Sequence, residues 1–102
     1  MQRYLEKQVD ITKDENEKHI NETIHLDYYL LESKPSDPEE FQGRTAYGIE
    51  IVKWVKNQMD ETAAFKDLFS SKEEARELLK KLAFNTVTPM AFPDIMEDCL
   101  GV

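Results

Sequence analysis

Apolar residues recur at helical spacing in the last third of the chain. Their positions, i, i+3, i+4 and i+7, define one face of a helix, and they are Ala75, Leu78, Leu79 and Leu82. Ser71 and Glu74 have the S-x-x-E spacing of a capping box, in which each side chain bonds a backbone N–H that the first turn leaves free. The pattern predicts an amphipathic helix that begins after Ser71 and ends at Asn85, with Asn85 in the left-handed conformation.

A second, shorter helix is predicted over residues 93–100. Pro93 suits its first position, where the missing N–H leaves no hydrogen bond unmade. The apolar stripe of this helix consists of Ile95, Met96, Cys99 and Leu100. A helix of this length is not stable alone in water, so we expect it to pack against the rest of the domain.

Upstream of the helices, apolar and polar residues alternate with a period of two, which is typical of β-strands. Strands are predicted over residues 4–11, 23–33, 47–56 and 62–68. The first strand is expected to carry Leu5, Val9 and Ile11 on one side. Lys7 interrupts that side, as a lysine does in edge strands. Residues 12–21 are predicted to form a turn or the tip of a long hairpin, and residues 34–45, with two prolines, a loop.

The two central strands, residues 23–33 and 47–56, are predicted to form a sheet whose two faces differ in the residues they carry. One face carries a row of large apolar residues, namely Ile24, Leu26, Tyr28, Leu30, Ile49 and Ile51. We expect the first helix to cover this face, since strands followed by helices are the pattern of an α+β domain. The predicted fold is a single α+β domain over residues 1–102, a four-stranded antiparallel β-meander followed by two C-terminal helices packed on one face.

The opposite face of the predicted sheet carries Tyr29, Leu31, Val52 and Trp54. Antiparallel sheets often leave one face in water, and an exposed apolar patch there would mark an interaction or dimer surface. In the alternative, the second helix or the loop over residues 34–45 covers this face.

The chain of 102 residues has a net charge of −8, from 13 basic and 21 acidic side chains. This charge argues against binding to nucleic acid, which requires clustered Lys and Arg, and against an anionic membrane surface. No apolar run is long enough to span a membrane, and the charged N-terminus is not a signal peptide. With a single Cys there is no internal disulfide, and the reducing cytoplasm is the expected location.

Three carboxylates share the outer face of the predicted second helix, and they belong to Asp94, Glu97 and Asp98. Such a face is either solvated or binds a divalent cation or a basic partner. Glu97 and Asp98 lie at the negative end of the helix dipole, and no Lys or Arg follows Lys81. We therefore predict that these two residues pair with basic groups from the sheet or from another chain.

The sequence predicts no metal ligands, cofactor or catalytic residues. The candidate metal cluster consists of His19, Glu22, His25 and Asp27, but its spacing matches no established ligand pattern. Cys99 is expected to be a packing residue, because the neighbouring carboxylates would raise the pKa of its thiol. The three glycines are not clustered, so no phosphate-binding loop is present.

Several stretches together have a family likeness, namely Tyr28-Tyr29-Leu30-Leu31-Glu32, the seven residues 47–53, Val87-Thr88-Pro89 and Asp94-Ile95-Met96-Glu97-Asp98. From about residue 5 onward the chain resembles a family of short uncharacterised proteins from Gram-positive anaerobic bacteria, a domain of unknown function. The resemblance implies a cytoplasmic location and a shared architecture, and it supplies no activity.

The functional prediction from the sequence is a non-enzymatic, intracellular interaction or regulatory protein. We expect it to self-associate through the face that carries Val52 and Trp54, together with Tyr29, or through the edge of the first strand, with a different protein as the alternative partner. Glu97 and Asp98 are further candidate interaction residues. The alternative is a small enzyme or cation-binding module that uses the acidic face of the second helix.

Overall fold

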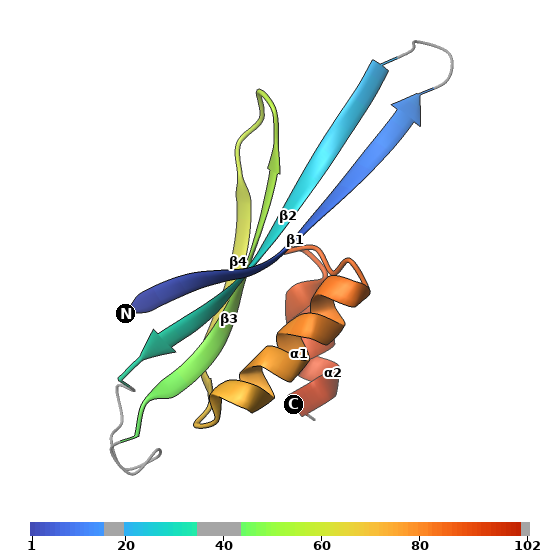
Figure 1. Ribbon diagram of the computed structural model, residues 1–102. Helices are drawn as coiled ribbons and strands as arrows, with labels where there is room; N and C mark the ends of the chain where they lie inside the picture. The colour runs from blue at the N-terminus through green and yellow to red at the C-terminus, as the bar shows by residue number, and fades with distance from the viewer. Residues whose placement is uncertain (16–19, 35–43, 101–102) are drawn as a thin grey trace.

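A computed structural model describes residues 1–15, 20–34 and 44–100, and within these ranges four strands precede two helices (Figure 1). The elements are β1 (Gln2–Glu15), β2 (Ile20–Ser33), β3 (Ala46–Val55), β4 (Glu61–Phe69), α1 (Lys72–Phe84) and α2 (Phe92–Leu100). The strands form one antiparallel sheet in the order β1-β2-β3-β4, so strands that follow one another in the chain are neighbours in the sheet. The predicted fold class is confirmed, and so is the edge position of the first strand.

Two predicted connections differ from the structure or lie beyond it. Of the residues 12–21 predicted as a turn or long hairpin tip, 12–15 belong to β1 and 20–21 to β2, and 16–19 lie outside the described residues. Cross-strand pairing of polar residues satisfies the backbone there as well as a turn would. Most of the predicted loop over residues 34–45 lies outside the described residues.

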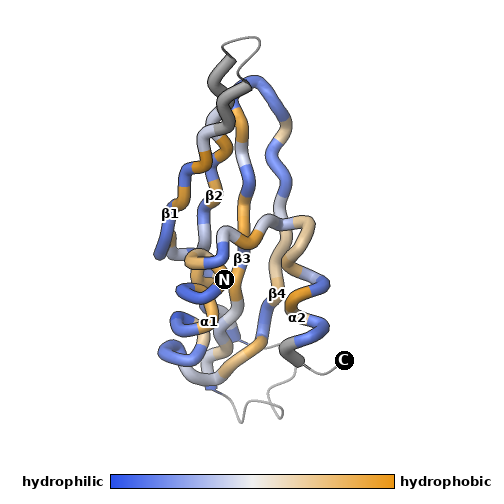
Figure 2. Tube along the Cα trace, turned by 90° about the vertical axis from the view of Figure 1, so that its right-hand side faces the viewer, coloured by the Kyte–Doolittle hydropathy of each residue, from blue (hydrophilic) through white to orange (hydrophobic). Residues whose placement is uncertain are grey.

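Both helices pack on one face of the sheet. In the view of Figure 2, α1 lies on the β1 side and α2 on the β4 side. Alternate residues of β2 and β3 face the helices and are buried with them, and this core comprises Leu26, Tyr28, Leu30, Ile49, Ile51, Ala75, Leu79, Leu82, Phe92 and Met96. The predicted contact between the leucine face of α1 and the apolar face of the sheet is confirmed. The removal of this apolar surface from water is the main force that holds the layers together.

The N-terminus of α1 shows the Ser71 half of the predicted capping box. The Ser71 side chain accepts a hydrogen bond from the Glu74 backbone N–H at 3.3 Å, and its backbone is extended. Glu73 and Glu74 lie in the first turn, where the positive end of the helix dipole favours carboxylates. The helix therefore begins where its local sequence places it.

The C-terminus of α1 differs from the prediction for Asn85. Asn85 has φ −91°, and the left-handed residue is Thr86, with φ 49°. The Thr86 N–H donates to the carbonyl of Ala83 at 3.1 Å, and the Val87 N–H donates to the carbonyl of Leu82 at 3.0 Å. This is the Schellman arrangement, in which the left-handed residue follows the cap by one position. The predicted left-handed Asn85 is wrong because burial of Val87 against the core sets the reversal one residue later.

Strand β1 contains a bulge that the sequence does not predict. Leu5 lies opposite Tyr29 and Lys7 lies opposite Tyr28, so Glu6 has no partner in β2. Paired residues of neighbouring strands share a face, and an inserted residue reverses the alternation beyond it. Leu5 and Lys7 therefore lie on opposite faces of the sheet.

The predicted grouping of Leu5 with Val9 and Ile11 is wrong for this reason. Val9 and Ile11 lie on the helix side and pack against the core, whereas Leu5 lies on the other side and is exposed. The side chain of Glu6 accepts a hydrogen bond from Arg76 Nε in α1 at 2.9 Å. This ion pair across the two layers accompanies the bulge.

A second register shift lies between β3 and β4, where Tyr47 is opposite Phe69 but Ile49 is opposite Phe65. The extra residues of β4 bring its backbone against Gly48. A Cβ atom at Gly48 would lie 2.1 Å from the carbonyl oxygen of Phe65, which is far inside van der Waals contact. Only glycine therefore fits at this position.

Tyr28 connects the sheet to the corner between the helices. Its side chain is fully buried, and its hydroxyl donates a hydrogen bond to the carbonyl of Val87 at 2.9 Å. Because burial disfavours the phenolate, the pKa of Tyr28 is raised to about 12. The bond gives a partner to the Val87 carbonyl, which lies in the buried corner between α1 and α2.

Candidate functional site

The face of the sheet opposite α1 and α2, called the open face below, is covered by no helix in the described part of the chain. The register of the three strands β1, β2 and β3 places eleven side chains on its middle part, from the Arg3–Leu31 pair to the row of Asp10, His25 and Trp54: Arg3, Leu5, Gln8, Asp10, His25, Asp27, Tyr29, Leu31, Glu50, Val52 and Trp54. They include the chain's single Trp, one of its four Tyr and three carboxylates. The open face is therefore both aromatic and acidic.

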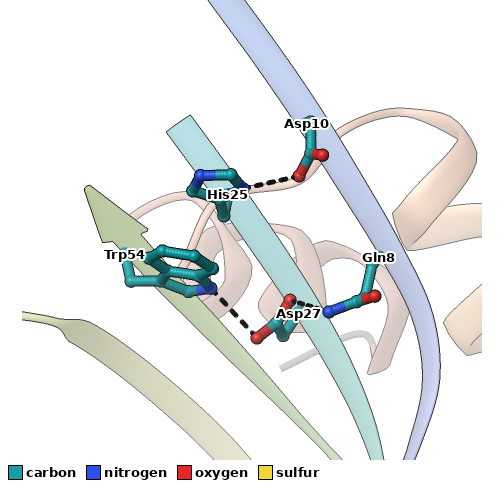
Figure 3. Close-up of polar contacts among 5 residues, drawn as sticks. All are labelled: Gln8, Asp10, His25, Asp27 and Trp54. Atoms are coloured by element: carbon teal, nitrogen blue, oxygen red, sulfur yellow. Dashed lines mark hydrogen bonds and ion pairs between the residues drawn. The ribbon is translucent and has the colours of Figure 1, made fainter. Parts of the chain in front are cut away.

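Asp27 is a buried carboxylate at the centre of this face. Its Oδ2 accepts a hydrogen bond from Trp54 Nε1 at 3.1 Å, and its Oδ1 accepts one from Gln8 Nε2 at 3.2 Å (Figure 3). A carboxylate removed from water requires such donors, because its lost hydration is otherwise uncompensated. The contacts fix the indole of Trp54, which is 36% exposed, in one orientation.

His25 extends this arrangement toward the edge of the sheet. Its ring stacks on Trp54 with 3.7 Å between the ring centroids and 15° between the planes. Its Nδ1 lies 2.7 Å from Asp10 Oδ1, and Figure 3 shows the two side chains meeting across β1 and β2. These contacts hold a stacked aromatic pair in place on the outer surface of the sheet.

A second cluster lies on the same face and again spans three strands. The Arg3 guanidinium carbon of β1 lies 3.8 Å from the centre of the Tyr29 ring in β2. Arg3 Nε lies 2.8 Å from Glu50 Oε1 in β3. This oxygen is buried, and it has an ion-pair partner but accepts no aligned hydrogen bond from the described residues. The Tyr29–Glu50 pair thus forms a seat for a guanidinium group.

The structure brings three of the predicted interaction residues to one face. Trp54 is partly accessible and Tyr29 less so, whereas Val52 is buried between its neighbours and contributes little surface. Leu31 is also buried, although it belongs to this face. The apolar patch that the sequence suggests is therefore a polar and aromatic surface. The alternative that the second helix covers it is wrong, because α2 lies on the other side, and the other proposed cover, the loop over residues 34–45, lies mostly outside the described residues.

The other two predicted interaction residues are remote from this surface. Glu97 and Asp98 are exposed on α2, and neither makes an ion pair with a residue of the described ranges. Pairing with another chain stays a prediction. In residues 1–15, 20–34 and 44–100, no group of three or more His, Cys, Asp or Glu side chains is placed to hold a metal ion. The alternative function, a cation site on the acidic helix, also stays a prediction.

The fold and this surface define a small α+β domain whose sheet is covered on one side by its two C-terminal helices. By sequence, the chain belongs to a family of unknown function, DUF6514, whose family model matches residues 7–102. No curated protein and no solved structure matches the chain. Neither α1 nor α2 has the length and apolar character that a membrane-spanning helix requires, and the described ranges contain no other helix.

Proposed function

We propose that this protein is a non-enzymatic, cytoplasmic interaction module that docks a partner protein on its open face and has a regulatory role. The observation that carries the proposal is the gathering of Trp54, Tyr29 and Arg3 on this one face. Trp, Tyr and Arg are the residue types that dominate binding energy at protein interfaces. The origin in Gram-positive anaerobes that the family resemblance implies is part of the same hypothesis.

The aromatic side chains are held in position before a partner arrives. Trp54 is fixed by Asp27 and by the stacked His25, and Tyr29 lies under Arg3. Ordering side chains on binding opposes association by about 0.5–1.5 kcal/mol for each flexible side chain. An interface whose main contacts are already ordered avoids most of this loss, which supports a recognition role for the open face.

The charges of the open face favour a different protein over a second copy. Asp10, Asp27 and Glu50 outnumber Arg3 on this face, and the whole chain carries −8. Two copies that met face to face would bring like charges together, which opposes association. A partner with basic residues is therefore the proposed occupant.

The test compares two variants in the cells that make the protein. Trp54→Ala removes the aromatic centre of the open face, and Met59→Ala is the control, because Met59 is equally apolar and 93% exposed in the turn between β3 and β4. Proteins that co-purify with the wild type should be retained by Met59→Ala and lost from Trp54→Ala. Circular dichroism establishes that each variant is folded, and Leu5→Ser, on the same face, replaces Trp54→Ala if that variant does not fold.

Two results would contradict this proposal. One is an unchanged set of co-purified proteins for the open-face variant. The other is a homodimer in light scattering that Trp54→Ala dissolves, which would replace the partner protein by a second copy of the chain.

A further inference from the structure

We propose that the open face recognises arginine side chains of a basic segment of the partner protein. In the free protein, Arg3 occupies one of the sites that would bind such an arginine, called the seat below. This inference rests on the proposed function, because it names the chemistry of the partner for the same surface. The seat is the pair of Tyr29 and Glu50.

The seat offers the two contacts that a guanidinium group uses best. The Tyr29 ring presents a π face, over which the Arg3 guanidinium carbon lies at 3.8 Å. The Glu50 carboxylate lies beside it, with Oε1 at 2.8 Å from Arg3 Nε. A planar guanidinium stacks on a ring and binds a carboxylate in its own plane at the same time, whereas a lysine ammonium has no plane to stack.

The seat is not fully used by the residue that fills it. Arg3 comes from the edge strand and its side chain is 48% exposed, so water already reaches one side of the pair. Glu50 has a side chain only 19% exposed, and its buried Oε1 accepts no aligned hydrogen bond from the described residues. An arginine that is not tethered to β1 is free to align two N–H groups with this carboxylate, which is the stronger arrangement. Replacement of Arg3 by an arginine of the partner is therefore favoured by the better hydrogen bonding to Glu50.

The same pairing of aromatic ring and carboxylate recurs farther along the face. The stacked rings of His25 and Trp54 lie next to Asp10, whose carboxylate is exposed. A basic segment lying along the face would meet a ring and a carboxylate at both places. The net charge of −8 attracts such a segment from a distance.

The single Trp of the chain lies on this face, so its fluorescence reports occupancy directly. The probes are two synthetic peptides of equal charge, nona-arginine and nona-lysine, titrated into the intact protein at physiological salt. We expect nona-arginine to shift the Trp54 emission and to bind at least about 5-fold more tightly than nona-lysine.

Matched variants separate the seat from general charge attraction. Glu50→Gln should weaken nona-arginine binding by about 5-fold or more, whereas Glu97→Gln, the same charge change on α2, should alter it less than about 2-fold. Arg3→Gln should strengthen binding by about 3-fold, because it empties the seat, and Lys56→Gln is its control in an exposed turn. Tyr29→Leu keeps an apolar but smaller side chain without the π face and should abolish the preference for arginine over lysine.

The inference is overturned if the two peptides bind equally, or if Glu50→Gln and Glu97→Gln weaken binding to the same extent. If nona-arginine does not bind while co-purified proteins still depend on Trp54, the arginine seat is wrong and the docking function stands. If the co-purified proteins do not depend on Trp54, the docking function itself is wrong.

Discussion

Phe92→Ala is expected to lower the free energy of unfolding by about 3–5 kcal/mol, whereas Phe84→Ala should change it by less than about 0.5 kcal/mol. Phe92 is fully buried at the start of α2, and its ring meets Phe65 of β4 edge to face, with 4.9 Å between centroids. Phe84 is 88% exposed at the end of α1. The same substitution thus removes a core contact at one position and almost none at the other.

Urea denaturation followed by circular dichroism measures both variants against the wild type. The pair is informative because α2 is too short to be stable on its own and is held by the side chains it buries. Equal losses for Phe84→Ala and Phe92→Ala, or a loss below about 1 kcal/mol for Phe92→Ala, would contradict the packing of α2 on the sheet.

Alkaline pH is expected to destabilise the protein through Tyr28. Its pKa is about 12 when folded, against an ordinary value of 10 for the unfolded chain, so between these pH values the folded state holds a proton that the unfolded state has released. The stability that depends on the neutral hydroxyl is complete below pH 10 and is lost as the pH rises toward 12. With about 1.4 kcal/mol for each pH unit, the loss is about 3 kcal/mol.

Tyr28→Phe isolates this contribution. At neutral pH the variant is expected to be less stable by about 1–3 kcal/mol, because the carbonyl of Val87 loses its buried donor. Above pH 10 the variant escapes the extra loss, so its stability should approach and then reach that of the wild type. Urea denaturation at pH 8, 10 and 11.5 measures the difference in stability between the wild type and the variant. If this difference stays constant over the range, the pKa of Tyr28 does not differ between the folded and unfolded states, which would contradict the prediction.

The covered side of the domain could be predicted from the sequence because its signals are local and periodic. The spacing of Leu79 and Leu82 gives the buried face of α1, and the alternation around Leu26 gives the inner face of β2. Ser71 fixes the start of α1 through contacts within one turn. Each of these three features depends on residues that are close together in the chain, so a local sequence pattern is enough to predict it.

The features that escaped prediction depend on contacts between distant residues. The bulge at Glu6 appears only when β1 is aligned with β2, and its ion pair reaches Arg76 in α1. The left-handed Thr86 depends on the burial of Val87 in the core. A one-residue change of register or conformation leaves no periodic trace in the sequence.

The same reasoning explains which parts of the open face could be predicted. Tyr29, Val52 and Trp54 follow from alternation along single strands. Arg3 was missed because the bulge moves it to this face, and the roles of Asp27 and Glu50 depend on which strand lies beside which. The alternation of β2 does place His25 and Asp27 beside Tyr29, which is the one sequence signal for a polar network there.

Hydroxyl-radical footprinting of the free protein, read by tandem mass spectrometry, tests the central claim that the helices cover one face and leave the other in water. The account predicts rapid oxidation of Trp54 and slow oxidation of Tyr28 and Phe92, which are fully buried on the covered side. Oxidation of Tyr28 as fast as that of Trp54, or protection of Trp54 equal to that of Phe92, would contradict it.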